Sequence, residues 1–430
     1  MKILLLGSGG REHAFAWKLS QSPLCTELFI APGNAGTRLH GTNVPLDPMD
    51  FEAVGRFVQE RGIEMVIPGP EAPLVAGITD WFEQHEALRH VPVIGPTAEA
   101  ARLEGSKAWA KDFMMENGIP TAACRVFTRE TMEEGLAYVR RHRLPVVLKA
   151  DGLAAGKGVV ICQTHEEAER EFRDMLAGKF GEASARVVVE QFLDGIEFSV
   201  FVALDGKNWQ ILPVAKDYKR VGEGDTGPNT GGMGAVSPVP FVDELMLEKV
   251  EEQIIRPTVA GLADEDIVYK GFLFLGLIDV DGNPCVIEYN CRMGDPETEV
   301  VFPRLDTDLV ALCHAIATGS LAGLQVKHDL REAATVMLVS GGYPGAYEKG
   351  KLIEGLDEVS DCIVFHAGTR LDDEGRVRTN GGRVLAITAL AATFPQALEI
   401  CYRNAEKIRF EGKYYRRDIG FDLIGHGAGE

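Results

Sequence analysis

The stretch from residue 286 to residue 299, VIEYNCRMGDPETE, predicts both the type of fold and the kind of chemistry. Its first half reads as a β-strand, and alternate side chains of a strand point to one face. We therefore expect Glu288, Asn290 and Arg292 to share a face that begins at Val286. Carboxylate and amide oxygens suit magnesium, and an arginine suits a phosphoryl oxygen. The stretch predicts a site that moves phosphate.

A Glu-x-Asn pair on its own more often marks an ordinary polar edge strand, so the prediction depends on features elsewhere in the chain. The length of 430 residues indicates two to four domains. A composition of 45% hydrophobic and 25% charged residues is typical of a globular protein. No apolar run approaches the roughly 18 to 20 residues of a membrane span, and the start is too short in apolar residues for a signal peptide.

The cysteines and the net charge narrow the function classes further. Eight cysteines are scattered without a CxxC pair, which favours reduced thiols in a cytoplasmic protein over a disulfide or zinc framework. A formal charge of −20 argues against non-specific binding of nucleic acid or of anionic membranes. A small polyanionic ligand stays compatible with this charge, because a few local cations and metal ions can neutralise it.

Residues 1–103 alternate short apolar strands with helical patterns, which predicts an N-terminal parallel α/β domain. Ligands of such sheets bind at the carboxyl ends of the strands, where loops rich in turn residues cluster here. The expected strands are 2–6, 27–31, 64–68 and 92–95, and the loops are 7–11, 32–36, 68–71 and 95–96. We expect the four loops to converge on one crevice.

The first loop, Gly7 to Arg11, resembles a dinucleotide fingerprint only in part. The third glycine of GxGxxG would fall at position 12, where this chain has Glu12. Glycines before a helix still offer backbone N–H groups to an anion. We therefore favour one phosphate monoester, with charge added by Arg11, over NAD. His13 reads as a packed or surface residue of the helix.

Residues 104–326 form a second unit, in which a lid at about 123–194 has an α+β pattern. A strand at 145–150 carries Lys149 and leads into the glycine-rich loop 151–159, and a helix at 165–177 precedes strands at 186–192 and 196–204. The loop is not a Walker A motif, since Lys157 precedes Gly158 instead of Ser or Thr. Lys149 lies in an apolar strand, and an ammonium buried there needs an anion.

The long polar segment at 217–238, DYKRVGEGDTGPNTGGMGAVSP, predicts a binding loop, because structureless segments of this length inside domains are usually functional. A helix at 242–263 and a hairpin strand at 270–280 lead to the strand that carries Glu288. Residues 327–430 read as a C-terminal α+β cap with strands 333–340, 363–367 and 383–390 and a helix from 395 to about 408. Local sequence favours a tight turn for 380–383 over a contact with the site.

Motifs along the whole chain resemble the glycinamide ribonucleotide synthetase family of the ATP-grasp superfamily. The sequence RMGDPETE is similar to a family signature, with Met293 where phenylalanine is more usual. The motifs that carry the resemblance are GSGGREHA (7–14), APGNAGT (31–37), IPGPEAPL (67–74), GSKAWAK (105–111), LKADGLAAGKGV (148–159), VVEQFLDGIEFSV (188–200), the 217–238 segment, IEYNCRMGDPETE (287–299) and NGGRVLAIT (380–388).

The resemblance implies that ATP binds between two antiparallel sheets, one from the lid and one from the core. Lys107 and Lys149 then contact phosphates, and the glycine loop with Gly156 closes over them. The backbone of Glu190, Phe192 and Leu193 meets adenine, Glu197 holds the ribose, and Glu288 and Asn290 ligate Mg²⁺ or Mn²⁺.

The implied reaction belongs to purine biosynthesis and has two steps. ATP phosphorylates the carboxylate of glycine, and the amine of 5-phosphoribosylamine then displaces phosphate to form an amide. Arg292, Lys149 and Asp295 are the implied catalytic residues, with Asp295 on the glycine ammonium. The implied substrate-binding residues are Gly9, Gly10, Arg11 and Glu71 for the phosphoribosyl part, and Asp217, Lys219, Arg220, Asn229 and Gly232. We expect a cytoplasmic monomer or weak homodimer that binds neither nucleic acid nor membranes.

One departure and three alternatives stay open at this point. Many ATP-grasp enzymes carry a second metal-binding carboxylate where this chain has Gly276, and Asp279 is near in sequence but uncertain in direction. Another ATP-grasp enzyme, such as a ribonucleotide carboxylase, should lack the 217–238 loop. A Rossmann-type oxidoreductase is disfavoured by Glu12, and a non-catalytic nucleotide-binding regulator by the presence of both Glu288 and Asn290.

Overall fold

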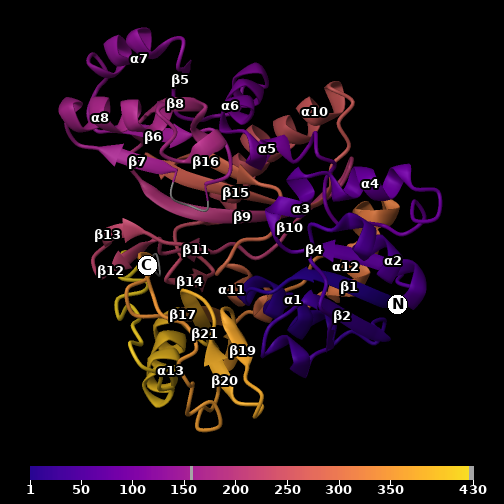
Figure 1. Cartoon of the computed structure of the whole chain (residues 1–430). Helices are drawn as coiled ribbons and strands as arrows, with labels where there is room; N and C mark the ends of the chain where they lie inside the picture. Colours follow the sequence, from indigo (N-terminus) through magenta and orange to yellow (C-terminus); the bar gives the residue numbers. More distant parts are fainter. Residues whose placement is uncertain (155–157, 426–430) are drawn as a thin grey trace.

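The computed structural model describes residues 1–154 and 158–425. Figure 1 shows a lid at one end of the molecule, a central sheet below it, an N-terminal domain to one side and a C-terminal domain at the opposite end. Within the described residues, no helix has the length and apolar character that crossing a bilayer requires.

The N-terminal domain has a parallel sheet in the order β3-β2-β1-β4. Its elements are β1 (Lys2–Gly7), α1 (Gly10–Leu19), β2 (Glu27–Pro32), β3 (Thr42–Asn43), α2 (Phe51–Arg61), β4 (Met65–Pro68), α3 (Glu71–Val75) and α4 (Ile78–Gln84). The strand expected at 92–95 is reduced to a single bridge between Val93 and Val66. Pro92 and Pro96 flank it, and proline has no N–H group to extend a ladder.

The central sheet and the lid sheet are both antiparallel and four-stranded. The central order is β10-β9-β15-β16, with β9 (Ile196–Asp205), β10 (Trp209–Ile211), β15 (Lys270–Val280) and β16 (Asn283–Asn290). The lid order is β5-β8-β6-β7, with β5 (Cys124–Thr128), α7 (Met132–Val139), β6 (Val146–Ala150), β7 (Val159–Cys162), α8 (His165–Leu176) and β8 (Arg186–Gln191). Short α5 (Arg102–Gly105) and α6 (Lys107–Glu116) connect the N-terminal domain to the lid.

A β-bulge interrupts the alternation that we predicted for β16. Gly276 of β15 pairs with Glu288, whereas the next residue, Leu277, pairs with Val286, so Ile287 is the extra residue. A bulge shifts the following side chains to the other face. The prediction that Val286 begins the face of Glu288 was therefore wrong, and Val286 is fully buried in the core instead.

The face of β16 also ends earlier than predicted. The strand stops at Asn290, and Arg292 lies in the bend beyond it. The Arg292 guanidinium is paired with Glu104 at 2.9 Å and with Glu71 at 3.3 Å. Only Glu288 and Asn290 thus share the strand face, and Arg292 contacts the N-terminal side of the molecule.

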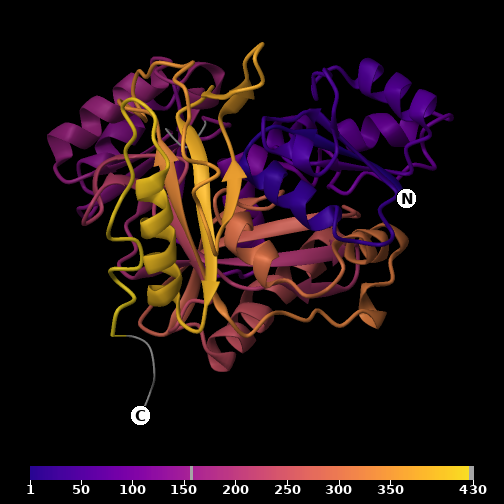
Figure 2. The same cartoon turned by 90° about the horizontal axis from the view of Figure 1, so that it is seen from below.

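The 217–238 segment folds into strands, and one of them belongs to the C-terminal sheet. That sheet has the order β11-β14-β17-β21-β18, in which β14 pairs antiparallel with β17. The strands are β11 (Lys216–Asp217), β14 (Gly234–Ser237), β17 (Glu332–Val339), β18 (Ile363–His366) and β21 (Arg383–Ala391), and β12 (Arg220–Gly222) with β13 (Thr226–Asn229) forms a separate hairpin. Figure 2 shows α13 (Phe394–Lys407) along one face of this sheet.

The helix expected at 242–263 is interrupted. It consists of α9 (Glu244–Val250), a π-helical turn (Glu251–Ile255) and α10 (Arg256–Asp264). Pro257 stands in the first turn of α10, and a proline inside a helix removes one backbone hydrogen bond and clashes with the preceding turn. The local shift to π geometry accommodates it.

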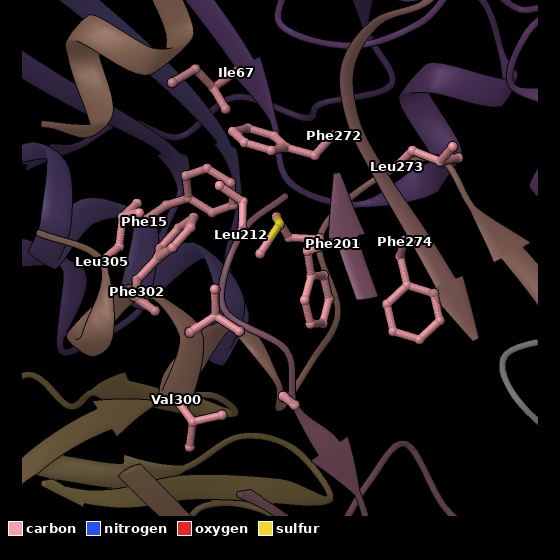
Figure 3. Packing of buried hydrophobic residues seen from close by; sticks show 14 of the residues in the cluster. Phe15, Ile67, Phe201, Leu212, Phe272, Leu273, Phe274, Val300, Phe302 and Leu305 are labelled. Carbon is pink, nitrogen blue, oxygen red and sulfur yellow. The ribbon is translucent and has the colours of Figure 1, made fainter. Parts of the chain in front are cut away.

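One apolar core joins the N-terminal domain, the central sheet and the C-terminal domain. Figure 3 shows side chains of α1 and the central sheet converging on α11 (Thr298–Arg304). The Phe15 ring packs edge-on against Phe302 at 4.7 Å and against Phe272 at 5.8 Å between centroids. The lid has a second, separate core between its sheet and its helices α7 and α8.

Because the lid has its own core, a substitution in that core should destabilise the lid without destabilising the central sheet. Phe172 is fully buried there, and its ring would meet any side chain at Gly135. Phe172→Ala should destabilise the lid by about 3–5 kcal/mol through lost contacts and a cavity. Hydrogen exchange of the β6 and β8 amides should accelerate while that of β15 stays unchanged. Leu245→Ala, at an exposed leucine, is the control; equal acceleration in both sheets would contradict the prediction.

Candidate active site

Two sheets face each other across the candidate site, and charged groups line both. Val147 pairs with Glu190 and Lys149 with Val188, so Lys149 and Glu190 share one face of the lid sheet. The opposite face, which includes Leu148 and Val189, forms the lid core. The Lys149 ammonium pairs with Glu190 at 2.9 Å and donates to the carbonyl of Ile287 in β16 at 3.1 Å. One lysine therefore joins the two sheets.

The charge of Lys149 is retained in spite of burial. Burial lowers its pKa, but Glu190, Glu288 and Glu197 raise it by more, so that the net pKa lies above the ordinary value. Lys107 lies at the start of α6, and its ammonium donates to the carbonyl of Gly152 at 3.3 Å. Burial lowers the pKa of Lys107, against the effect of Glu288. Lys149 and Lys107 thus both lie near the carboxylate of Glu288.

Lys111 is a buried cation that the sequence reasoning missed. Its ammonium lies 3.4 Å from Glu190 and donates to the Thr121 hydroxyl at 2.7 Å. Glu190 therefore has a lysine on each of its oxygens. A lysine on the apolar side of α6, one turn after Lys107, was the available signal.

Glu288 and Asn290 fit a metal site by their chemistry and position. They are two residues apart beyond the bulge, so both point to the face that carries Glu197, because Glu197 pairs with Ile278 and Gly276 with Glu288. Among the described residues, neither side chain makes an intramolecular hydrogen bond or ion pair. Both are oxygen donors of the kind magnesium uses together with waters and phosphates.

The protein alone does not form a complete metal cage. In the described parts of the chain, no group of three or more His, Cys, Asp or Glu residues is placed to hold an ion. At Gly276, a Cβ would lie 3.1 Å from Cγ of Glu288, so a side chain there would crowd that carboxylate. Asp279 is three residues from Gly276 on the regular strand β15 and therefore points to the opposite face. Neither position supplies a second carboxylate beside Glu288.

The 217–238 segment brings a third cation to this face. The Lys219 ammonium is paired with Glu197 at 2.8 Å and with Asp217 at 2.9 Å. Burial lowers its pKa, but Asp217, Glu197 and Glu288 together raise it well above the ordinary value. Arg220 and Asn229 pair across the β12–β13 hairpin, and the Arg220 guanidinium donates to Gly227 within it.

A second cluster forms where three parts of the chain meet. Arg383 of β21 lies 3.0 Å from the Asp295 carboxylate and donates to the backbone oxygens of Asp295 at 2.9 Å and Gly231 at 2.7 Å. The backbone N–H of Arg11 donates to the Asp295 carboxylate at 3.4 Å. Local sequence favoured a tight turn for residues 380–383 over a contact with the site. That expectation was wrong for Arg383, which contacts Asp295. Gly232, with φ of +119°, passes directly beside Pro296.

Glu12 explains the missing third glycine of the first loop. Its carboxylate accepts from the backbone N–H of Gly9 at 2.6 Å and from the Arg11 guanidinium at 2.7 Å. A Cβ at Gly7 or Gly69 would fall within 2.6 Å of Glu12. The glutamate side chain thus occupies the space over these glycines. Because the N–H groups of Gly9 and Arg11 already donate to carboxylates, phosphate binding by this loop stays a prediction.

Two further acids of the GDPETE sequence were missed. Burial and the nearby Asp217 raise the pKa of Glu297 to about 7. Glu299 is fully buried, and among the described residues neither of its carboxyl oxygens has a hydrogen-bond partner. Burial and then Asp295 raise the pKa of Glu299 well above its ordinary value, and Arg383 lowers it by less. A run of three acids in five residues at the start of α11 was the sequence signal.

The remaining predicted residues are placed as follows. Gly10 lies against Glu299, since its Cβ would come within 2.3 Å of the carboxyl oxygen. Glu71 begins α3 and reaches Arg292. Phe192 and Leu193 follow β8 and are half-buried. Gly156 lies outside the described residues.

The chain is similar to known proteins along its length. Models of phosphoribosylglycinamide synthetase match the chain in order: the N domain at residues 1–104, the ATP-grasp (A) domain at 105–298 and the C domain at 333–422. The phosphoribosylamine–glycine ligase of Pseudomonas aeruginosa is 50% identical over 100% of both chains. That of Thermotoga maritima has a solved structure with 38% identity and a TM-score of 0.84, covering 97% of this chain and 100% of the other.

A more distant structure shares the fold alone. The biotin carboxylase domain of Hydrogenobacter thermophilus 2-oxoglutarate carboxylase is 18% identical with a TM-score of 0.71, over 98% of this chain and 93% of the other. The predicted fold class, an N-terminal parallel sheet with an ATP-grasp core and a C-terminal α+β domain, is confirmed.

Glu299 generates a prediction for the pH dependence of stability. The folded state holds a proton on Glu299 above the pH at which the unfolded glutamate releases it, so the wild type should lose stability as pH rises from about 4.5. Glu299→Gln does not titrate. The free energy of unfolding of the variant relative to wild type should therefore increase as pH rises above the ordinary glutamate range, by up to about 1.4 kcal/mol per pH unit while Glu299 keeps its proton.

Urea denaturation at several pH values measures this difference. Glu399→Gln, at an exposed glutamate of α13, is the matched control and should show no such gain. A difference between Glu299→Gln and wild type that stays constant with pH would show that Glu299 is ionised in the folded protein.

Proposed function

The chain belongs to the phosphoribosylglycinamide synthetase family, and on this premise we propose that it ligates glycine to 5-phosphoribosylamine with ATP. The products are glycinamide ribonucleotide, ADP and phosphate, and the reaction is a step of purine biosynthesis. The observation that carries the proposal is the Lys149 ammonium, which contacts both sheets at 2.9 and 3.1 Å on a face with Lys107 and Glu288 nearby. A face with two lysines and a metal-binding carboxylate suits a nucleoside triphosphate.

The first step moves the γ-phosphoryl group of ATP to a carboxylate oxygen of glycine. One P–O bond to ADP breaks, and one to glycine forms. Lys149 and Lys107 neutralise phosphate charge, and the burial of Lys149 between the sheets limits access of water. Glu288 and Asn290 hold Mg²⁺ or Mn²⁺, which when bound supplies further charge neutralisation on the phosphates.

The second step is attack by the amine of 5-phosphoribosylamine on the acyl phosphate. The amide C–N bond forms, phosphate leaves with the electrons of the C–O bond, and the amine releases a proton. No protein nucleophile is required, so alignment and electrostatics carry the catalysis. We assign the glycine ammonium to Asp295, because Arg383 and Arg11 outweigh burial and keep the pKa of Asp295 below its ordinary value. An ionised carboxylate suits an ammonium.

Other parts of the site have assigned roles in the proposal. Glu197 holds the ribose of ATP, and the backbone at Glu190, Phe192 and Leu193 meets adenine. Arg292 faces the transferring phosphoryl group, supported by its ion pairs with Glu71 and Glu104. Gly9, Gly10, Arg11 and Glu71 receive the phosphoribosyl group.

The remaining proposals concern the whole chain. We place domain boundaries near residues 103 and 326 and the lid at about 123–194, supported by the separate lid core. A monomer or weak homodimer in the cytoplasm is proposed, and the eight free cysteines support a reducing location.

Omission of each substrate tests the reaction. ADP release should require glycine and 5-phosphoribosylamine together, and bicarbonate should not replace glycine, because the acyl phosphate of glycine is the proposed intermediate. ADP is measured by a coupled assay while each component is left out in turn. Productive turnover with bicarbonate would identify a carboxylase instead.

Glu288→Gln tests the metal assignment. It keeps the shape of the side chain but removes the charge, so kcat should fall about 100-fold or more, as for loss of one transition-state stabilising group. Binding of Mn²⁺ in the presence of ADP, measured by electron paramagnetic resonance, should weaken as well. Glu248→Gln, at an exposed glutamate of α9, is the control. Unchanged Mn²⁺ binding in Glu288→Gln would remove Glu288 from the metal site.

A further inference from the structure

The last described part of the C-terminal domain lies against the β12–β13 hairpin of the central segment. Residues 414–422 contact this hairpin at both its tip and its base, although almost 200 residues separate them in sequence. The proposed reaction gives residues 414–422 no role.

Arg416 is at the centre of the contact and is fully buried. Its guanidinium makes a two-pronged ion pair with Asp418 at 2.8 and 2.9 Å. It also donates to the Asp225 carboxylate at 2.7 Å and to the backbone oxygen of Arg220 at 3.1 Å, both on the hairpin. Breaking such a buried pair on one side leaves an uncompensated charge, which is strongly destabilising locally.

Neighbours of Arg416 extend the contact along the hairpin. The backbone N–H of Gly224 donates to Asp418 at 2.6 Å, and the Tyr414 hydroxyl donates to the Val221 carbonyl at 2.9 Å. At the base, the Tyr218 hydroxyl donates to Asp422 at 2.7 Å. The 414–422 segment therefore holds the hairpin at several points.

The hairpin depends on this support because it buries little apolar surface of its own. The residues of β12 are half-buried, and Thr226, Gly227 and Pro228 of β13 are exposed. A two-stranded hairpin without a packed face is at best marginally stable in water. Its ordered position therefore relies on Arg416 and its neighbours, beside the packing of Val221 against the main core.

The hairpin emerges from the residue that reaches the active site. Lys219 directly precedes β12, and its ammonium bridges Asp217 and Glu197. Thr230, directly after β13, donates through both its N–H and its hydroxyl to the Lys219 carbonyl at 2.7 and 2.8 Å. Displacement of the hairpin consequently displaces Lys219.

We propose that Arg416 is a positioning residue that holds the hairpin so that Lys219 stays on Glu197, which makes the end of the C-terminal domain part of the nucleotide site. This inference rests on the proposed function for its kinetic consequence. It implies that the contact matters for turnover only through Lys219.

A double-mutant cycle tests the coupling. Asp225→Asn removes the hairpin carboxylate that Arg416 binds, at a half-exposed position whose positive φ of 53° asparagine tolerates. It should lower kcat/KM for ATP about tenfold in the wild-type background. In a Lys219→Met background, the same substitution should change kcat/KM less than about twofold, because coupled residues are not additive. Arg416→Gln should behave in the same way.

Two further variants separate positioning from general destabilisation. Tyr414→Phe removes one hydroxyl from a partly exposed ring and should produce a smaller loss of the same kind, also absent in the Lys219→Met background. Arg403→Gln, at an exposed arginine of α13 that is paired with Asp361 at 3.6 Å, removes the same charge away from the hairpin and should leave kcat/KM unchanged.

The outcomes are distinguishable from failure of the proposed reaction. If the wild type releases no ADP with glycine and 5-phosphoribosylamine, the proposed function fails. The contact between residues 414–422 and the hairpin is then tested by hydrogen exchange of the 218–230 amides. Asp225→Asn should accelerate this exchange, and Arg403→Gln should not. If the wild type is active but the Asp225→Asn and Lys219→Met losses multiply, or Asp225→Asn has no effect on rate or exchange, the positioning role is overturned.

Discussion

The structure depends on the placement of one buried cation, the ammonium of Lys149, between two sheets. A charge removed from water must be compensated in full, and here Glu190 supplies the anion while the β16 backbone supplies an acceptor. This requirement fixes which face of the lid sheet turns toward the central sheet. The opposite face is then free to be apolar, so that the lid carries its own core under α7 and α8.

The same principle organises the side of the site away from the lid. Arg383, Asp295 and Arg11 come from three regions of the sequence, and α11 starts between them. Phe302 of α11 packs against Phe15 of α1 in the apolar core (Figure 3). The apolar core joins the domains that carry these charged groups. A rigid arrangement of this kind suits chemistry that relies on alignment.

Much of the fold could be predicted from the sequence, because long periodic segments determine element type. The strand around Lys149, the lid helix α8 and the C-terminal helix α13 all begin and end within one or two residues of their expected bounds. The errors had two sources: strand pairing, which leaves no local signal, and prolines, which are visible in the sequence. The bulge at Ile287 depends on pairing with β15, and strand 92–95 is limited by its flanking prolines.

Prediction of the site was limited for the same reason. Glu288 and Asn290 share a face because their spacing of two survives the bulge, whereas Arg292 leaves that face because β16 ends first. Lys111, Glu297 and Glu299 left a signal in the sequence, but their partners, like those of Arg383, come largely from segments far away in the chain. Glu12 was visible as an exception to a glycine pattern, but its position over Gly7 and Gly69 required coordinates.

The pairing of β14 with β17 has a consequence for the modularity of the protein. The C-terminal sheet takes its strands β11 and β14 from before the β15–β16 pair of the central sheet and the rest from after residue 331. A cap excised from residue 327 onward would lose those strands, and β17 would become an open edge of unpaired backbone groups. Such an edge is a template for self-association between chains. The C-terminal domain is therefore only partly contiguous in sequence, and a functional fragment of it would have to include β14.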